Sequence, residues 1–177
     1  MVTGQSSGKK VNIAFVIGHL SHGGAEKQLF LLSKGIDKSK FNPVIICLSK
    51  DNYPWGDRIS ESGVPIVYIP RLSRFDVTRV IRLTWCFYKY NINIIVSSLH
   101  ITNLYTWLAR LFYFRNSRYL AQVRSKETLM GSMAKWLNIR ALNSADLIIT
   151  NSKLLRSFVV EFFKQDNKKI VTINNGI

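Results

Sequence analysis

At 177 residues the chain has the length of one ordinary domain, with 47% hydrophobic and 20% charged residues, which excludes a disordered protein. Its 10 glycines and 4 prolines are too few for a fibrous chain, and no apolar run reaches the roughly 18 residues of a membrane helix. The formal net charge of +15 implies a polyanionic partner such as nucleic acid, an anionic membrane surface or a phosphate-bearing substrate.

The N-terminal segment, residues 1–10, is polar and is predicted to be a flexible tail. It lacks the apolar stretch of a secretory signal. Farther along, Cys47 and Cys86 lie inside apolar segments. They are therefore predicted to be reduced core residues of a cytosolic protein, with no disulfide and no metal site.

Short β-branched runs alternate with longer amphipathic segments from residue 11 to residue 177. Most of these runs are continuously apolar, which indicates strands buried on both faces. Helical spacing is clear in Val77–Tyr88 and in Leu154–Phe163, the latter capped by Asn151 or Ser152. The alternation predicts one α/β, Rossmann-like three-layer domain with a mostly parallel sheet of about seven strands. The predicted strands are Val11–Ile17, Pro43–Leu48, Pro65–Ile69, Ile92–Ser98, Tyr119–Val123, Asp146–Thr150 and Lys169–Ile173.

A glycine-containing loop, Gly18–Glu26, follows the first predicted strand and leads into a helix expected near Lys27. In such sheets ligands bind beyond the carboxyl ends of the strands. The adjacent Gly23 and Gly24 would let backbone N–H groups at the helix start approach an anion. The loop matches neither the P-loop nor the G-x-G-x-x-G pattern. A phosphate-binding loop and a tight turn that needs glycine both remain open.

Polar side chains also follow three later strands, and we expect them to face the same edge of the sheet. His100 could be structural or functional, and Arg124 could equally be a surface charge. The sequence shows no Ser/His/Asp order, metal-spaced cluster or close carboxylate pair, so neither a metal site nor an acid–base pair is predicted. The residues at these strand ends are Ser97, Ser98, Leu99, His100, Thr102 and Asn103, with the last two at a predicted helix start, then Arg124, Ser125 and Lys126, and finally Asn151 and Ser152.

Basic and aromatic residues are concentrated between Val77 and Asn143, where ten Lys/Arg and eleven aromatic residues accompany a single acid, Glu127. This mixture suits a membrane interface, and it also suits single-stranded nucleic acid. A core with a solvated basic rim is the simpler interpretation for any one of these residues.

Two segments resemble glycosyltransferase family 4. The strand and the loop Gly18–Glu26 resemble the opening of these enzymes, and Ala145–Ser152 followed by Lys168–Ile177 resembles the close of their N-terminal domain. The resemblance covers nearly everything from Val11 onward. It implies one half of a GT-B fold, the acceptor-side domain of a retaining, nucleotide-sugar-dependent glycosyltransferase, without the C-terminal donor domain.

The resemblance implies roles for a few residues and leaves the catalytic residues unknown. Gly23 and Gly24 would lie near the donor diphosphate, while His100, Asn103 and Arg124 would lie on the acceptor side. Arg124 stands where many members have histidine. The donor would be a UDP- or GDP-sugar, used as substrate without a cofactor, and cationic groups in place of a metal would stabilise the leaving diphosphate.

The resemblance and the basic charge together imply a glycan or lipid-linked acceptor of bacterial envelope synthesis and a peripheral, cytoplasmic place on the inner face of the membrane. This chain alone is expected to be inactive, because half of a two-domain cleft cannot hold the donor. The alternative is a basic Rossmann-like nucleic-acid-binding or regulatory module. No recognisable RNA- or DNA-binding motif supports nucleic acid as a partner, and no acidic cluster marks a receiver-like regulatory domain.

Overall fold

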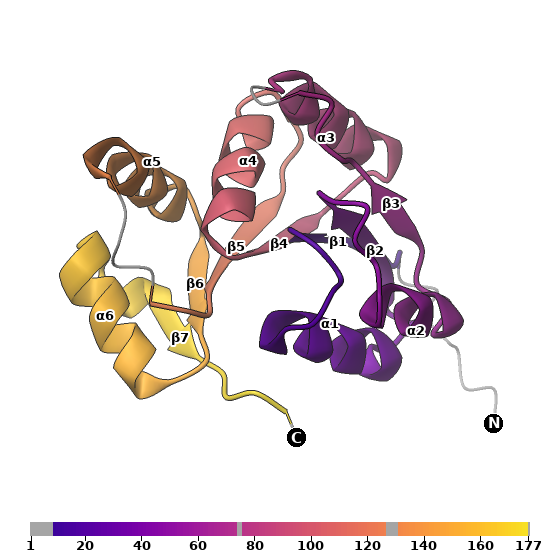
Figure 1. Ribbon diagram of the computed structural model, residues 1–177, viewed down its shortest axis with the longest axis horizontal. Coiled ribbons are helices and arrows are strands. Elements are labelled where there is room, and N and C mark those ends of the chain that lie inside the picture. Colours follow the sequence, from indigo (N-terminus) through magenta and orange to yellow (C-terminus); the bar gives the residue numbers. More distant parts are fainter. Residues whose placement is uncertain (1–8, 74–75, 127–130, 177) are drawn as a thin grey trace, which may run out of the picture.

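The computed structural model describes residues 9–73, 76–126 and 131–176. Within them seven strands form one parallel sheet in the order β3-β2-β1-β4-β5-β6-β7 (Figure 1). The predicted tail lies outside the described residues up to residue 8, and so does Glu127. The strands are β1 (Val11–Ile17), β2 (Phe41–Cys47), β3 (Ile66–Tyr68), β4 (Ile94–Ser98), β5 (Arg118–Val123), β6 (Leu147–Thr150) and β7 (Ile170–Thr172).

All seven predicted strands are confirmed, and β1 has the predicted bounds. Their apolar runs are buried because the sheet has helices on both faces. In β2, for example, Val44, Ile45 and Ile46 are each at most 2% exposed. The Rossmann-like architecture predicted from the alternation is therefore also confirmed.

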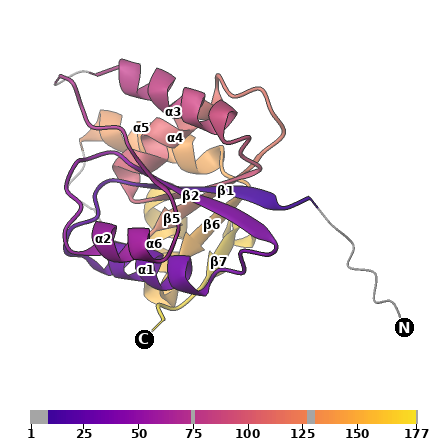
Figure 2. The same cartoon turned by 90° about the vertical axis from the view of Figure 1, so that its right-hand side faces the viewer.

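Two groups of helices cover the two faces of the sheet (Figures 1 and 2). One core cluster includes Leu29 and Ile59, which α1 and α2 contribute. The other includes Leu83, Leu142 and Phe163 from the second group. The first group is α1 (Gly24–Gly35) and α2 (Trp55–Glu61); the second is α3 (Thr78–Lys89), α4 (His100–Arg110), α5 (Ser132–Asn143) and α6 (Lys153–Phe163), followed by a 3-10 turn at Asn167–Lys169.

Two helix starts differ from the prediction. Helix α1 begins at Gly24, three residues before Lys27. This start places Glu26 in the first turn, where a negative charge is stabilised by the helix dipole. Helix α4 begins at His100, directly after β4, so Asn103 lies within the helix and not at its start. At α6 the predicted cap is confirmed, since the Ser152 hydroxyl accepts a hydrogen bond from the Leu155 N–H at 3.2 Å.

Cys47 and Cys86 are buried, free thiols, as predicted for core residues. Burial raises the pKa of the Cys47 thiol to about 11. Both side chains belong to the hydrophobic core clusters. They therefore act as small apolar residues and not as nucleophiles.

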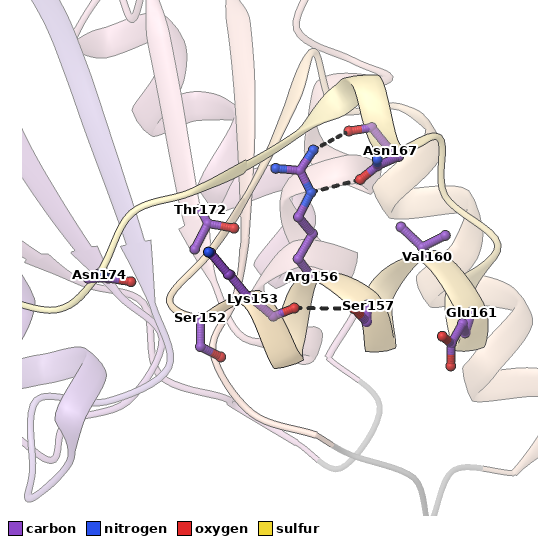
Figure 3. A pocket seen from close by; sticks show the side chains of 9 residues that line it. All are labelled: Ser152, Lys153, Arg156, Ser157, Val160, Glu161, Asn167, Thr172 and Asn174. Atoms are coloured by element: carbon purple, nitrogen blue, oxygen red, sulfur yellow. Dashed lines mark hydrogen bonds between the residues drawn. The ribbon is translucent and has the colours of Figure 1, made fainter.

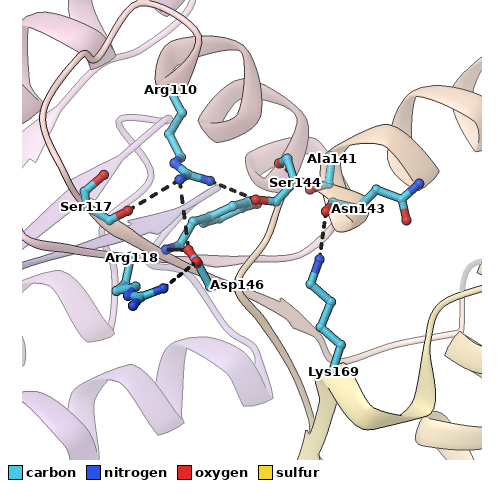
Figure 4. A network of polar contacts seen from close by, with 9 residues as sticks. Arg110, Ser117, Arg118, Ala141, Asn143, Ser144, Asp146 and Lys169 are labelled. Atoms are coloured by element: carbon cyan, nitrogen blue, oxygen red, sulfur yellow. Dashed lines mark hydrogen bonds and ion pairs between the residues drawn. The ribbon is translucent and has the colours of Figure 1, made fainter.

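A polar network fastens β5 to β6 at the amino edge of the sheet (Figure 4). Asp146 accepts from the Tyr119 backbone N–H at 2.7 Å and pairs with Arg118 at 3.1 Å. Arg110 donates to the Ser144 carbonyl at 3.0 Å and lies 4.0 Å from Asp146. Since these charges satisfy one another, the network stabilises the contact between β5 and β6.

No helix in the described ranges combines the length and the apolar composition that crossing a bilayer requires.

Candidate functional site

An open pocket of about 290 Å³ lies at the carboxyl edge of the sheet, and we call it the glycine-loop pocket. It brings together the loop after β1 and residues that follow β4, β5, β6 and β7. Its position matches the general rule for ligand binding in open α/β sheets. It is lined by His19, His22, Gly23, Gly24, Ala25, Glu26, Leu99, Arg124, Ser125, Asn151 and Asn175.

The two glycines in this pocket are not required by backbone conformation. Gly23 has φ 175° and ψ 159°, an extended geometry that any residue adopts. Gly24 is the first residue of α1, and a Cβ there would meet nothing within 4 Å. A Cβ at Gly23 would collide only with the Glu26 carboxylate. The geometry therefore does not support a turn that needs glycine. It leaves open space beside Gly24, and no side chain makes a capping hydrogen bond at the start of α1.

Arg124 reaches the same pocket from the end of β5. Its Nε donates to Gln122 Oε1 at 2.9 Å, and its Nη1 donates to Asn175 Oδ1 at 3.1 Å. Desolvation lowers the pKa of Arg124, and the charge of Glu26 opposes that shift. Arginine side chains stay protonated in proteins, so Arg124 brings a positive charge to the pocket. The sequence placed Arg124 apart from the glycines, on the acceptor side. The structure places it in one pocket with Gly23 and Gly24.

His100 and Asn103, the two acceptor-side candidates on α4, do not line this pocket. Because α4 begins directly after β4, their side chains turn into the core. His100 is 6% exposed, and its ring lies 5.6 Å from that of Phe163. Asn103 is fully buried, accepts from the Ser97 hydroxyl and donates to the Gln122 carbonyl. Both residues therefore pack at the end of β4, where Asn103 links β4 to β5 through its hydrogen bonds.

Leu99 lines the pocket, although its place in the sequence indicates only a strand-end residue and not a candidate for a role in the site. It connects β4 to α4 with φ 76° and ψ 161°, a conformation that is rare outside glycine. Holding such a residue there costs about 1–3 kcal/mol, and strained residues of this kind cluster at functional sites. Nothing in a leucine signals this conformation in a sequence.

A second open pocket, of about 700 Å³, lies at the carboxyl ends of β1, β2 and β3, and we call it the basic pocket. It shares His19 with the glycine-loop pocket. Lys50 follows β2 and Arg71 follows β3, so the position after a strand end is the sequence signal that indicates both residues. The lining residues are Gly18, His19, Leu48, Ser49, Lys50, Pro70, Arg71, Arg79, Ile101 and Tyr105.

A third pocket, of about 770 Å³, lies beside the start of α6 (Figure 3). Its main cation, Arg156, donates from Nε to Asn167 Oδ1 at 2.7 Å and from Nη2 to the Asn167 carbonyl at 3.0 Å. Ser152 caps the helix. Arg156 and Ser152 thus already have hydrogen-bond partners, and Lys153 is a second cation that lines the pocket.

Among the residues that the structure describes, no three His, Cys, Asp or Glu side chains come close enough to hold a metal ion. The cations at the carboxyl edge are arginine and lysine side chains. These groups can bind phosphate and stabilise negative charge on a leaving group.

Comparison with known proteins gives one family and several similar folds. Residues 22–177 match the model of Glycosyltransferase Family 4. No curated protein sequence matches the chain significantly.

Among the solved structures, Anabaena Alr3699/HepE in complex with UDP superposes with a TM-score of 0.78 at 13% identity, over 94% of this chain and 44% of that one. A glycosyltransferase from Rickettsia africae ESF-5 gives 0.75 at 18% identity, over 95% and 44%. The lipopolysaccharide outer core galactosyltransferase WaaB gives 0.71 at 14% identity, over 94% and 46%. The chain thus has the fold of one half of these GT-B structures and spans under half of their length.

Proposed function

The chain belongs to glycosyltransferase family 4, and from this premise we propose that it is the N-terminal, acceptor-side domain of a retaining enzyme that uses a nucleotide-sugar donor. The observation that carries the proposal is the glycine-loop pocket, where the open start of α1 meets the guanidinium of Arg124. The Anabaena Alr3699/HepE structures are complexes with UDP and with UDP-glucose, which supports a nucleotide-sugar donor.

In this proposal the glycine-loop pocket stabilises the leaving diphosphate. As the bond from the anomeric carbon to the diphosphate oxygen breaks, negative charge develops on that oxygen. The N–H groups at the start of α1 and the cation of Arg124 face this charge. Arg124 is already fixed by Gln122 and Asn175, so little reorganisation is needed when the charge appears.

We also propose that the acceptor is a lipid-linked glycan of envelope synthesis and that the domain lies on an anionic membrane surface. Along α3 and its N-cap residue Val77, three apolar side chains at helical spacing are exposed to solvent: Val77 is 74%, Ile81 68% and Trp85 58% exposed. Lys89 lies over the Trp85 ring, with Nζ 4.9 Å from its centroid. An apolar stripe next to cations is typical of helices that lie in the headgroup region.

Sugar transfer by the enzyme that contains this domain tests the proposal. It should transfer sugar from a UDP- or GDP-sugar to lipid extracted from bacterial membranes, with retention at the anomeric carbon in the NMR spectrum of the product. The 177-residue chain alone should transfer nothing. Inversion would reject the retaining mechanism. Absence of transfer together with tight, salt-sensitive binding of single-stranded RNA would favour the nucleic-acid alternative.

A further inference from the structure

The basic pocket contains several positively charged side chains. It lies at the carboxyl ends of β2 and β3, two strands that contribute no residue to the glycine-loop pocket. Lys50 follows β2, Arg71 follows β3, and Arg79 lies in the first turn of α3. None of the described residues that line this pocket is acidic. Cations on three separate elements therefore converge without a carboxylate among them.

Arg79 is the buried member of this group. Its residue is 5% exposed, its Nη2 donates to the Leu48 carbonyl at 2.9 Å, and its guanidinium lies 5.0 Å from the centroid of the Tyr105 ring. Its Nε is buried and has no hydrogen-bond partner within the described part of the chain. A buried N–H group without an acceptor costs free energy, which an incoming anion would recover.

Two acids lie close to this pocket: Asp76, and Asp51, whose carboxylate accepts from the hydroxyl of the pocket residue Ser49 at 3.0 Å. The Asp76 carboxylate pairs with Arg82 at 2.6 Å, and it also accepts from the Thr78 hydroxyl and from the Leu72 N–H. Burial lowers the pKa of Arg79 and the nearby charge of Arg71 adds to this shift, while Tyr105 and the Asp76 carboxylate oppose it. The pocket thus holds like charges that repel one another until an anion arrives.

The N-terminus of helix α4 adds a partial positive charge next to the basic pocket. It is 11 residues long, its N-terminus has no side-chain cap, and Ile101 in its first turn lines the basic pocket. The positive end of the helix dipole is thus close to the cations. Ile101 is also 54% exposed and gives the pocket an apolar margin.

We propose that the basic pocket binds the phosphate or diphosphate group of the acceptor, and that this acceptor is a lipid phosphate. The proposal rests on the proposed function, since it assigns a chemical class to the substrate of that enzyme. His19 belongs to both pockets, so the donor diphosphate and the acceptor phosphate would lie on its two sides. The apolar margin at Ile101 would accept the first carbons of the lipid chain.

Calorimetric titration of the 177-residue chain with inorganic diphosphate and with farnesyl diphosphate tests this proposal without requiring transferase activity. The double variant Lys50→Gln/Arg71→Gln changes two exposed side chains of the pocket. It should weaken binding of both ligands about tenfold or more. The control Lys34→Gln/Lys168→Gln removes the same charge from exposed positions outside the pocket and should change affinity less than twofold. Arg79→Gln should also weaken binding, with a thermal melt to show that the variant folds.

Farnesyl diphosphate should bind more tightly than inorganic diphosphate, because only the former reaches the apolar margin. Equal affinity would reject the lipid and leave an anion site alone. Equal loss in both double variants would reject the site, since it would mean general charge attraction. Binding that depends on Arg124 and not on Lys50 and Arg71 would place the diphosphate in the glycine-loop pocket and would also overturn the proposal. If the enzyme fails to transfer sugar while these affinities hold, the proposed function fails and the anion site stands.

Discussion

Arg124 and Asn175 are joined side chain to side chain across 51 residues, with Nη1 donating to Oδ1 at 3.1 Å. This bond ties the end of β5 to the segment after β7 and fixes the guanidinium in the glycine-loop pocket. The charge of Arg124 is therefore held where the proposal places the donor diphosphate.

We expect Arg124→Ala in the enzyme to lower kcat/KM for the nucleotide-sugar about ten- to hundredfold, because it removes one stabilising donor. The KM for the acceptor should change little. Arg124→Lys should recover part of the activity, since it keeps the charge but loses the fork geometry. Arg140→Ala, an exposed arginine on α5, serves as the control. A rise confined to the acceptor KM would return Arg124 to the acceptor side.

Gly24→Ala should separate a ligand-binding role from a folding role. Its Cβ would meet nothing within 4 Å, so the domain should be as stable as the wild type or more stable by up to about 1 kcal/mol. Turnover should nevertheless fall, because the added methyl group occupies the space where a phosphate would approach the backbone. Gly24→Val should lower turnover further.

Gly35→Ala is the matched control, since Gly35 ends the same helix and its Cβ would also meet nothing within 4 Å. Gly35→Ala should leave turnover unchanged and should raise the melting temperature slightly or not at all. If Gly24→Ala has normal activity, no ligand lies against the start of α1.

The sequence predicted the sheet well and the site in part, and the difference has a physical cause. Buried strands such as β1 can be predicted from their continuous apolar runs, because helices cover both faces of these strands. The site depends on side-chain direction at the ends of these strands. His100 follows β4 as predicted, yet α4 begins at this residue and turns it into the core. Leu99 occupies the site through its backbone conformation, which a sequence does not display.

Lowering the pH should destabilise the domain through Asp76. Hydrogen bonds from the Thr78 hydroxyl and the Leu72 N–H, together with the charge of Arg82, lower the pKa of Asp76 from 3.8 to about 2. The folded chain thus keeps this carboxylate ionised at pH values where the unfolded chain protonates it. This contribution to stability is present above about pH 4 and is lost as the pH falls toward 2.

Asp76→Asn should therefore melt at a lower temperature at pH 7 and lose less of its stability between pH 5 and pH 2.5 than the wild type does. Asp57→Asn, at an exposed position of α2, is the control and should follow the wild-type curve. Parallel curves for the wild type and Asp76→Asn would show that Asp76 contributes nothing to the acid sensitivity. Thermal melts followed by circular dichroism at each pH provide the measurement.

Membrane binding should depend on the exposed stripe of α3. Each Lys or Arg near an anionic surface contributes about 1 kcal/mol, and an exposed aromatic side chain adds insertion into the headgroup region. The chain should float with phosphatidylglycerol vesicles at low salt, and the bound fraction should fall at high salt. Ile81→Glu places a carboxylate within the stripe at a 68% exposed position and should reduce the bound fraction several-fold.

Leu154→Glu is the matched control for this experiment, because Leu154 is 67% exposed on α6 and lies on a different helix from the stripe. It adds the same negative charge, so a purely electrostatic attraction of the whole chain would weaken equally in both variants. If the exposed stripe of α3 lies among the lipid headgroups, only the Ile81→Glu variant should lose binding to the vesicles. Equal retention of the wild type by anionic and neutral vesicles would reject the anionic surface as the partner.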